Sequence, residues 1–217
     1  MTSEVPLIPS KKLQSIQPAL FLVIDGVNLL PHPSKPRMLA LSDEIEINYM
    51  VLHKLGTAED INMELLYNVL LYVQSTALNM SGQQRLFLRT RDKKLIAVDP
   101  RLDIPRTFDL FSEMMFHFLT KGLVRGPGGE RLMYYANSDL GHVLPPGVRR
   151  ICVFTDEKAP VTVVQKGQKC VYLSVDGKWE CQDELMSERN CISNDRLSCT
   201  TTAARVIANA ELENDLW

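Results

Sequence analysis

Hydrophobic positions along this chain fall into runs and stripes whose spacing predicts alternating strands and helices. The apolar run ALFLVIDGVNLL, residues 19–30, predicts a buried strand that turns at Gly26. The stretch TAEDINMELLYNVLLYVQSTAL, residues 57–78, has apolar side chains at helical spacing and predicts a long helix. Thr57 precedes Asp60 by three residues, which is a carboxylate variant of the capping box and predicts where this helix begins.

A strand pair and a second helix follow. The stretch RLFLRTRDKKLIAVDP, residues 85–100, predicts two strands joined by a turn at RDKK. We expect the next helix to be capped by Thr107 and to end at Gly122. Its apolar stripe consists of Phe108, Phe111, Met115, Phe118 and Leu119.

The C-terminal third repeats the alternation. Short buried strands are predicted over residues 149–155, 160–165 and 169–175, and a helix over residues 199–217. Strands that alternate with helices and are apolar throughout are typical of an α/β fold with a largely parallel sheet. We therefore expect a polar tail over residues 1–18 and a single domain over residues 19–217.

Composition narrows the function only slightly. The 217 residues carry a net charge of −2, so a nucleic-acid site has to be a local cationic patch. All five cysteines lie in the last third and none forms a CxxC pair, which favours reduced thiols inside the cell over disulfides or zinc. No apolar run reaches the length of a membrane span, and no GxGxxG, P-loop, GxSxG or HExxH motif is present.

One segment is locally basic. Between Arg85 and Arg106 the chain has seven Lys or Arg residues and three Asp. Strand alternation puts Arg85, Phe87 and Arg89 on one face, and this charge has two interpretations: a solvated face or a track for phosphates. Arg106 comes just before the predicted helix at Thr107, and a helix N-terminus beside a cation is a suitable place for a phosphate.

Three stretches, in this order along the chain, resemble the Nep/Emg family of ribosome-biogenesis methyltransferases. They are LHKLGTAEDIN (residues 52–62), DPRLDIPRTFDLFSEMMFHFLTK (residues 99–121) and CISNDRLSCTTTAARV (residues 191–206). The resemblance implies a SPOUT-type α/β knot, with a C-terminal trefoil knot and a homodimer built across it. It also implies that S-adenosyl-L-methionine binds among the knot loops, mostly through backbone groups. The cofactor-binding positions implied are Ala159, Ser174, Gly177, Ile192, Ser193, Asn194, Asp195, Arg196 and Leu197.

The activity implied is methylation of N1 of a pseudouridine in small-subunit rRNA during ribosome biogenesis. By the same resemblance, Asp60 is the candidate catalytic residue that orients or accepts the N1 proton, although a first-turn carboxylate also stabilises its own helix. The candidate RNA-binding residues are Arg85, Arg89, Arg101 and Arg106. The implied partners are small-subunit rRNA and ribosomal proteins or assembly factors, with no membrane, and the implied location is the nucleus and nucleolus.

The chain departs from the family pattern at several places. Glu59, Asp103 and Leu110 stand where the family has arginines, and Ser174 stands nearest the first glycine of the family's cofactor loop. These changes leave a second hypothesis open, a catalytically weak or inactive SPOUT-fold assembly factor that binds rRNA or ribosomal protein. A third is an unrelated α/β protein with a chance match.

Overall fold

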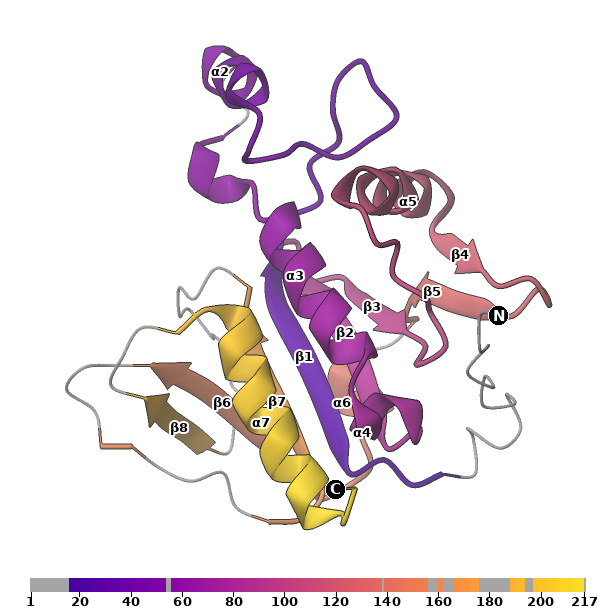
Figure 1. The fold of residues 1–217 in the computed structure, drawn as a ribbon, viewed down its shortest axis with the longest axis vertical. Helices are drawn as coiled ribbons and strands as arrows, with labels where there is room; N and C mark the ends of the chain where they lie inside the picture. Colours follow the sequence, from indigo (N-terminus) through magenta and orange to yellow (C-terminus); the bar gives the residue numbers. More distant parts are fainter. Residues whose placement is uncertain are drawn as a thin grey trace.

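A computed structural model describes residues 16–53, 56–137, 139–155, 160–161, 166–175, 188–193 and 197–216. The described strands form one eight-stranded sheet in the order β4-β5-β3-β2-β1-β7-β6-β8 (Figure 1). The sheet is mixed, with a parallel part on one side of the pairing between β2 and β3 and an antiparallel part on the other.

The parallel part is built around the strand predicted from the first apolar run. It consists of β1 (Leu20–Val27), β2 (Gln84–Thr90), β6 (Arg149–Thr155), β7 (Lys169–Ser174) and β8 (Glu188–Ser193). β1 pairs in parallel with β2 and β7, and β6 pairs in parallel with β7 and β8. The carboxyl ends of all five strands therefore lie at one edge of the sheet, where α/β proteins usually bind ligands.

The antiparallel part contains the predicted hairpin. β3 (Leu95–Val98) pairs with β2, as expected, and then with β5 (Arg131–Tyr135), which pairs with β4 (Leu123–Arg125). The chain after α5 thus forms a short hairpin, β4 and β5, that extends the sheet.

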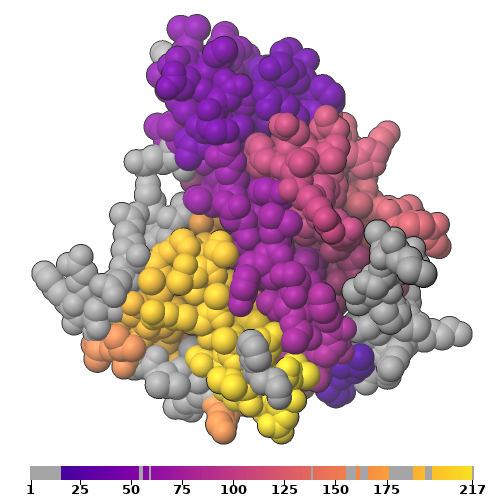
Figure 2. Space-filling view, viewed as in Figure 1, coloured from indigo at the N-terminus to yellow at the C-terminus, as the bar shows by residue number. Residues whose placement is uncertain are grey.

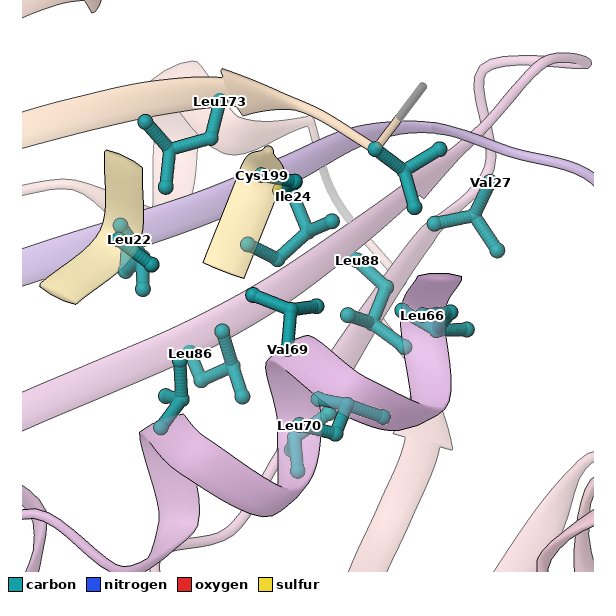
Figure 3. Close-up of a cluster of buried hydrophobic side chains, with 14 of the residues drawn as sticks. Leu22, Ile24, Val27, Leu66, Val69, Leu70, Leu86, Leu88, Leu173 and Cys199 are labelled. Carbon is teal, nitrogen blue, oxygen red and sulfur yellow. The ribbon is translucent and has the colours of Figure 1, made fainter. Parts of the chain in front are cut away.

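Helices cover one face of the sheet. α3 (Met63–Gln74), α5 (Phe108–Lys121) and α7 (Cys199–Glu213) lie on this face, and α3 and α7 pack side by side (Figure 1). Figure 3 shows the core between them and the strands, where Val69 and Leu70 of α3 meet Leu86 and Leu88 of β2. The short helix α6 (Leu140–Val143) packs through Leu140 on a second cluster with Phe21, Phe87 and Tyr172.

The prediction of one long helix over residues 57–78 is wrong in extent. It is divided into a 3-10 turn η1 (Ala58–Asp60), helix α3 and a short helix α4 (Ala77–Met80). The first break follows because Ile61 is extended and the side chain of Asn62 bonds to other segments instead of capping α3. The second break follows because Thr76 caps a new helix, accepting from the main-chain N–H of Asn79.

The second predicted helix is confirmed as α5. Phe111, Met115 and Phe118 are fully buried, and the helix ends at Gly122 in the left-handed conformation (φ 70°). Thr107 occupies the N-cap position, but its side chain makes no capping hydrogen bond, so that part of the prediction is wrong.

Helix α2 (Glu44–Leu52) was not predicted, because its apolar residues do not share one face: Met50 is buried whereas Ile45 and Leu52 are exposed. It belongs to a projection at the top of Figure 2, which has a small core of its own. Within this projection the buried carboxylate of Glu46 pairs with Arg37 and accepts from the main-chain N–H of Ala40 at 2.7 Å.

The strand order is compatible with the predicted trefoil knot, since the chain passes from β6 to the inner strand β7 and returns to the outer strand β8. The residues that connect these strands, 156–159, 162–165 and 176–187, lie outside the described part of the chain. The knot, the N-terminal tail and most of the strand expected over residues 160–165 stay predictions. No helix in the described part is long and apolar enough to cross a membrane.

Candidate functional site

A polar network ties the end of β1 to the segment that carries Asp60. The Oδ1 atom of Asn62 accepts from the main-chain N–H of Asn28 at 3.0 Å, and its Nδ2 atom donates to the carbonyl of Gly26 at 2.8 Å. Asn28 in turn donates from Nδ2 to the main-chain carbonyl of Asp60 at 3.0 Å. These bonds hold Asp60 at the carboxyl edge of the parallel strands.

The carboxylate of Asp60 is oriented by its own turn and by the next strand. It accepts from the main-chain N–H of Thr57 at 2.7 Å, which confirms the predicted capping contact, and it pairs with Arg91 just beyond β2. The hydrogen bond from Thr57, followed by the contact with Arg91, lowers the pKa of Asp60. Asp60 is therefore ionised at neutral pH, and its side chain stays partly accessible.

Gly56 leaves room for this carboxylate. A Cβ atom at Gly56 would lie 2.7 Å from Oδ2 of Asp60, and the glycine has a φ of 149°. A side chain at this position would meet the Asp60 carboxylate, so the glycine at position 56 leaves that carboxylate in place.

We expect Asn62→Ala to lower the free energy of unfolding by about 1–3 kcal/mol, because the N–H of Asn28 and the carbonyl of Gly26 lose their partner in a site that is 1% exposed. Urea denaturation measures this loss. Asn68→Ala is the matched control, since Asn68 is exposed on the same helix and its removal should leave the midpoint nearly unchanged. Equal midpoints for the two variants would contradict the structural role of Asn62.

The predicted basic face of β2 is present, but its two arginines, Arg85 and Arg89, bind other groups of the same chain. Phe87 faces the second cluster, and Arg89 donates from Nε to Oδ1 of Asp25 at 2.8 Å. The guanidinium of Arg89 lies 5.4 Å from the ring centroid of Tyr172. Arg85 donates to the carbonyls of Gly82, Gln84 and Ile16, and burial lowers its pKa.

The four arginines expected to bind RNA do not form one continuous track. Arg101 is bound to Asp99 through Nε at 2.7 Å, near the edge where β2 begins, and that edge is opposite to the one where Asp60 lies. Arg106 is exposed before α5, and two residues later the ring of Phe108 lies 5.8 Å from that of Tyr67 in α3. Of the four, Arg106 is thus the exposed cation that packing brings near the start of α3, while a role in RNA binding stays a prediction for all four.

The described part of the expected cofactor pocket lies at the same edge. Ser174 ends β7 and Ser193 ends β8, both buried, and Ile192 accepts through its carbonyl from Arg205 at 3.1 Å. Leu197 is half-buried just before Ser198, which caps α7 by accepting from the N–H of Thr201. The other positions named for the cofactor, Ala159, Gly177, Asn194, Asp195 and Arg196, lie outside the described residues.

These strand ends fit an adenosyl ligand as far as they are described. Ser174 and Ser193 are small polar residues that end the two strands flanking β6. Contacts through backbone groups suit such an edge, because parallel strands end there with main-chain groups not yet paired in the sheet.

Several residues of this site escaped sequence reasoning. Arg91 was counted only as part of a basic segment, and Asn28, Asn62 and Gly56 were given no role. One signal was available: Asn28 follows directly after a buried strand, where polar residues of α/β proteins gather at the ligand edge.

Comparison with known sequences agrees with the three stretches singled out above. A family model described as EMG1/NEP1 methyltransferase matches residues 21–211. The ribosomal RNA small subunit methyltransferase nep-1 of Caenorhabditis elegans is 26% identical over 205 residues, covering 91% of this chain and 87% of that protein. The ribosomal RNA small subunit methyltransferase NEP1 of Candida glabrata is 24% identical over 209 residues, covering 93% of this chain and 90% of that protein.

Comparison of folds gives the same result. The crystal structure of Archaeoglobus fulgidus Nep1 bound to S-adenosylhomocysteine superposes with a TM-score of 0.66 over 91% of this chain and 99% of that chain, at 14% sequence identity. This match confirms the predicted α/β fold, and the chance-match hypothesis is excluded. Because the family model spans nearly all of the described residues, this chain belongs to the EMG1/NEP1 methyltransferase family.

Proposed function

We propose that this chain transfers a methyl group from S-adenosyl-L-methionine to small-subunit rRNA. The family match over residues 21–211 carries this proposal, and relatives that cover most of the chain are named for the same reaction. The related archaeal protein was crystallised with S-adenosylhomocysteine, which is the product of such a transfer. The ionised Asp60 at the carboxyl edge of the sheet supplies a group suited to the chemistry.

The acceptor in this proposal is N1 of a pseudouridine. This nitrogen carries a proton that has to leave as the nitrogen attacks the methyl group, and its acidity is close to that of an imide. A carboxylate that is held by Thr57 and Arg91 can orient the N–H and accept the proton within hydrogen-bond reach. The larger contribution is positioning, since bound reactants held in line avoid the entropy cost of their encounter.

Two further groups of residues complete the proposed active site, one for the cofactor and one for rRNA. S-adenosyl-L-methionine, when bound, supplies a methyl group on a sulfonium, and the ends of β7 and β8 at Ser174 and Ser193 would hold it together with the loops that follow. Arg106, exposed before α5, would bind an rRNA phosphate at the helix N-terminus. The target base has to leave its stack to reach Asp60, as loop-targeting RNA enzymes require.

The direct test uses two small-subunit rRNA transcripts, one made with uridine and one with pseudouridine throughout. Both are incubated with the protein and isotope-labelled S-adenosyl-L-methionine, and nucleosides are identified by mass spectrometry. We expect label only in the pseudouridine transcript, as 1-methylpseudouridine. Label in the uridine transcript would contradict the choice of N1. Binding of rRNA without any label would favour the assembly-factor hypothesis. That hypothesis is supported by the three positions at which this chain lacks an arginine of the family and has Glu59, Asp103 and Leu110 instead.

We expect Arg106→Glu to weaken binding of an rRNA fragment and to reduce the slope of log K against log salt concentration by about 0.7, the value of one lost phosphate contact on a single strand. Fluorescence anisotropy over a salt series measures both. Lys166→Glu is the control, because Lys166 is exposed beside the start of β7, at the other edge of the sheet. An unchanged slope for Arg106→Glu contradicts the phosphate contact.

We also propose that the protein works as a homodimer in the nucleolus, where small-subunit rRNA is processed, together with ribosomal proteins or assembly factors. Family membership supports this assignment. The mass of the protein in solution tests the dimer, and a monomer at concentrations that give full activity would contradict it.

A further inference from the structure

A cavity of about 710 Å³ lies around the turn that follows β2 and has no role in the proposed reaction. It is bounded by the turn between β2 and β3, by Tyr135 at the end of β5, by Leu119 of α5, and by α6 with Arg150 of β6. Its volume lies within the range of about 300–1,000 Å³ that is usual for small-ligand sites.

The lining of the cavity is cationic. It contains four cations and one carboxylate: Arg89, Lys93, Lys94, Arg150 and Asp139. Asp25 and Asp92 offset two of these cations, since they pair with Arg89 and Lys94, respectively. Lys93 is exposed, and among the described residues we find no ion pair for it. Lys93 is therefore the cation of the lining that this structure offers most directly to a ligand.

The backbone at Lys93 supports a role for its ammonium group. Lys93 has a φ of 62° and closes the hairpin turn by donating from its main-chain N–H to the carbonyl of Thr90 at 2.9 Å. Glycine or asparagine takes this left-handed position at lower cost in backbone free energy. A lysine here places a cation at the cavity at the expense of an easier turn.

The remaining walls suit a base. Leu95, Leu119 and Leu140 are apolar, Tyr135 is half-buried and aromatic, and the exposed Asn137 offers an amide that can both donate and accept hydrogen bonds. Unstacked bases in RNA are commonly bound by aromatic side chains and by polar groups that read their edges, while cations bind the adjacent phosphate.

We propose that this cavity binds one nucleotide, with its base against Tyr135 and the leucines and its phosphate at Lys93. The cavity includes Lys93 and Lys94 of the turn that follows β2, so it reaches the carboxyl edge of the parallel strands, where Asp60 also lies. This inference rests on the proposed function for its preferred source of nucleotide, a residue of the substrate rRNA next to the target. A free nucleotide has the same chemistry and is the other source.

Two variants change the cavity in different ways. Lys93→Asn removes the charge and keeps a residue that tolerates the left-handed turn. Gly141→Leu adds bulk, because a Cβ atom at Gly141 would stand 3.7 Å from Nη2 of Arg150, at ordinary contact distance and without backbone strain. Lys166→Asn is the matched control for charge, near the start of β7.

The measurement is anisotropy with an rRNA fragment and, separately, calorimetry with uridine 5′-monophosphate, both over a salt series. We expect Lys93→Asn to reduce the salt slope for the fragment by about 0.7, the value of one phosphate contact. We expect Gly141→Leu to weaken binding of the fragment about tenfold, which corresponds to the loss of one base–aromatic contact. Lys166→Asn should bind as the wild type does.

The outcomes separate this proposal from the proposed function. If the wild type binds and methylates rRNA, and both cavity variants bind it with unchanged affinity and salt slope, the cavity proposal is overturned while the methyltransferase stands. If both variants weaken uridine 5′-monophosphate binding but leave the rRNA fragment unaffected, the ligand is a free nucleotide and the rRNA source is overturned. Circular dichroism melting of each variant checks that the fold is intact.

Discussion

Asp60→Asn is expected to lower the rate of methyl transfer on the order of 10²–10⁴-fold, the usual contribution of a positioned general base or proton-orienting group. The amide keeps the shape of the side chain but cannot accept the N1 proton as an anion does. Binding of rRNA and of S-adenosyl-L-methionine should change little, because neither depends on this carboxylate in the proposed site. Single-turnover kinetics with a pseudouridine-containing transcript separates the chemical step from binding.

The control for this variant is Glu113→Gln, which makes the same chemical change on an exposed position of α5. A second variant, Gly56→Ala, tests the position of the carboxylate, since its Cβ atom would meet Oδ2 of Asp60 at 2.7 Å. We expect it to slow transfer while Asp60 is still present. If Asp60→Asn transfers methyl groups at the rate of Glu113→Gln, Asp60 acts only as a capping residue of its turn.

The pH dependence follows from the lowered pKa of Asp60. The ionised form is the active one, so activity that depends on Asp60 is lost only when pH falls through a value below the ordinary aspartate pKa of about 3.9. The same sign applies to stability: the contacts with Thr57 and Arg91 stabilise the fold above the unfolded pKa, and this contribution is lost as pH falls. A rate change near neutral pH that disappears in Asp60→Asn would contradict this assignment.

Phe111→Ala is expected to lower the free energy of unfolding by about 3–5 kcal/mol. Phe111 is fully buried, and its ring centroid lies 5.0 Å from that of Tyr67, so it joins α5 to α3 under the Asp60 site. The loss combines the transfer free energy of the ring with the cavity left behind, and it is a large share of the about 5–15 kcal/mol that stabilises a typical domain. Urea denaturation with a common m-value measures it.

The adjacent residue provides the control. Leu110 is 56% exposed on the same helix, so Leu110→Ala should change the unfolding free energy by no more than about 0.5 kcal/mol. A similar loss in both variants would mean that the helix itself, and not the contact between α5 and α3, determines the effect.

Helix α5 and the region around Asp60 differ in how well the local sequence pattern predicts their secondary structure. The apolar stripe of α5 and its terminal Gly122 were readable because each depends on residues within one or two turns. The break before α3 was not readable, because Asn62 bonds to Gly26, which lies 36 residues away. Propensity favours one continuous helix here, and tertiary hydrogen bonds override it.

By itself, the sequence determined the α/β class, the central strand, the hairpin, α5, the family and the capping turn of Asp60. These follow from side-chain periodicity, turn residues and motifs, which are local properties of the chain. Only the tertiary structure decided that Arg91 holds Asp60, that Asn62 ties its turn to β1, and that the arginines are divided between two edges. The reason is that strand order sets which distant side chains meet, and each cation binds the nearest anion or carbonyl that this order provides.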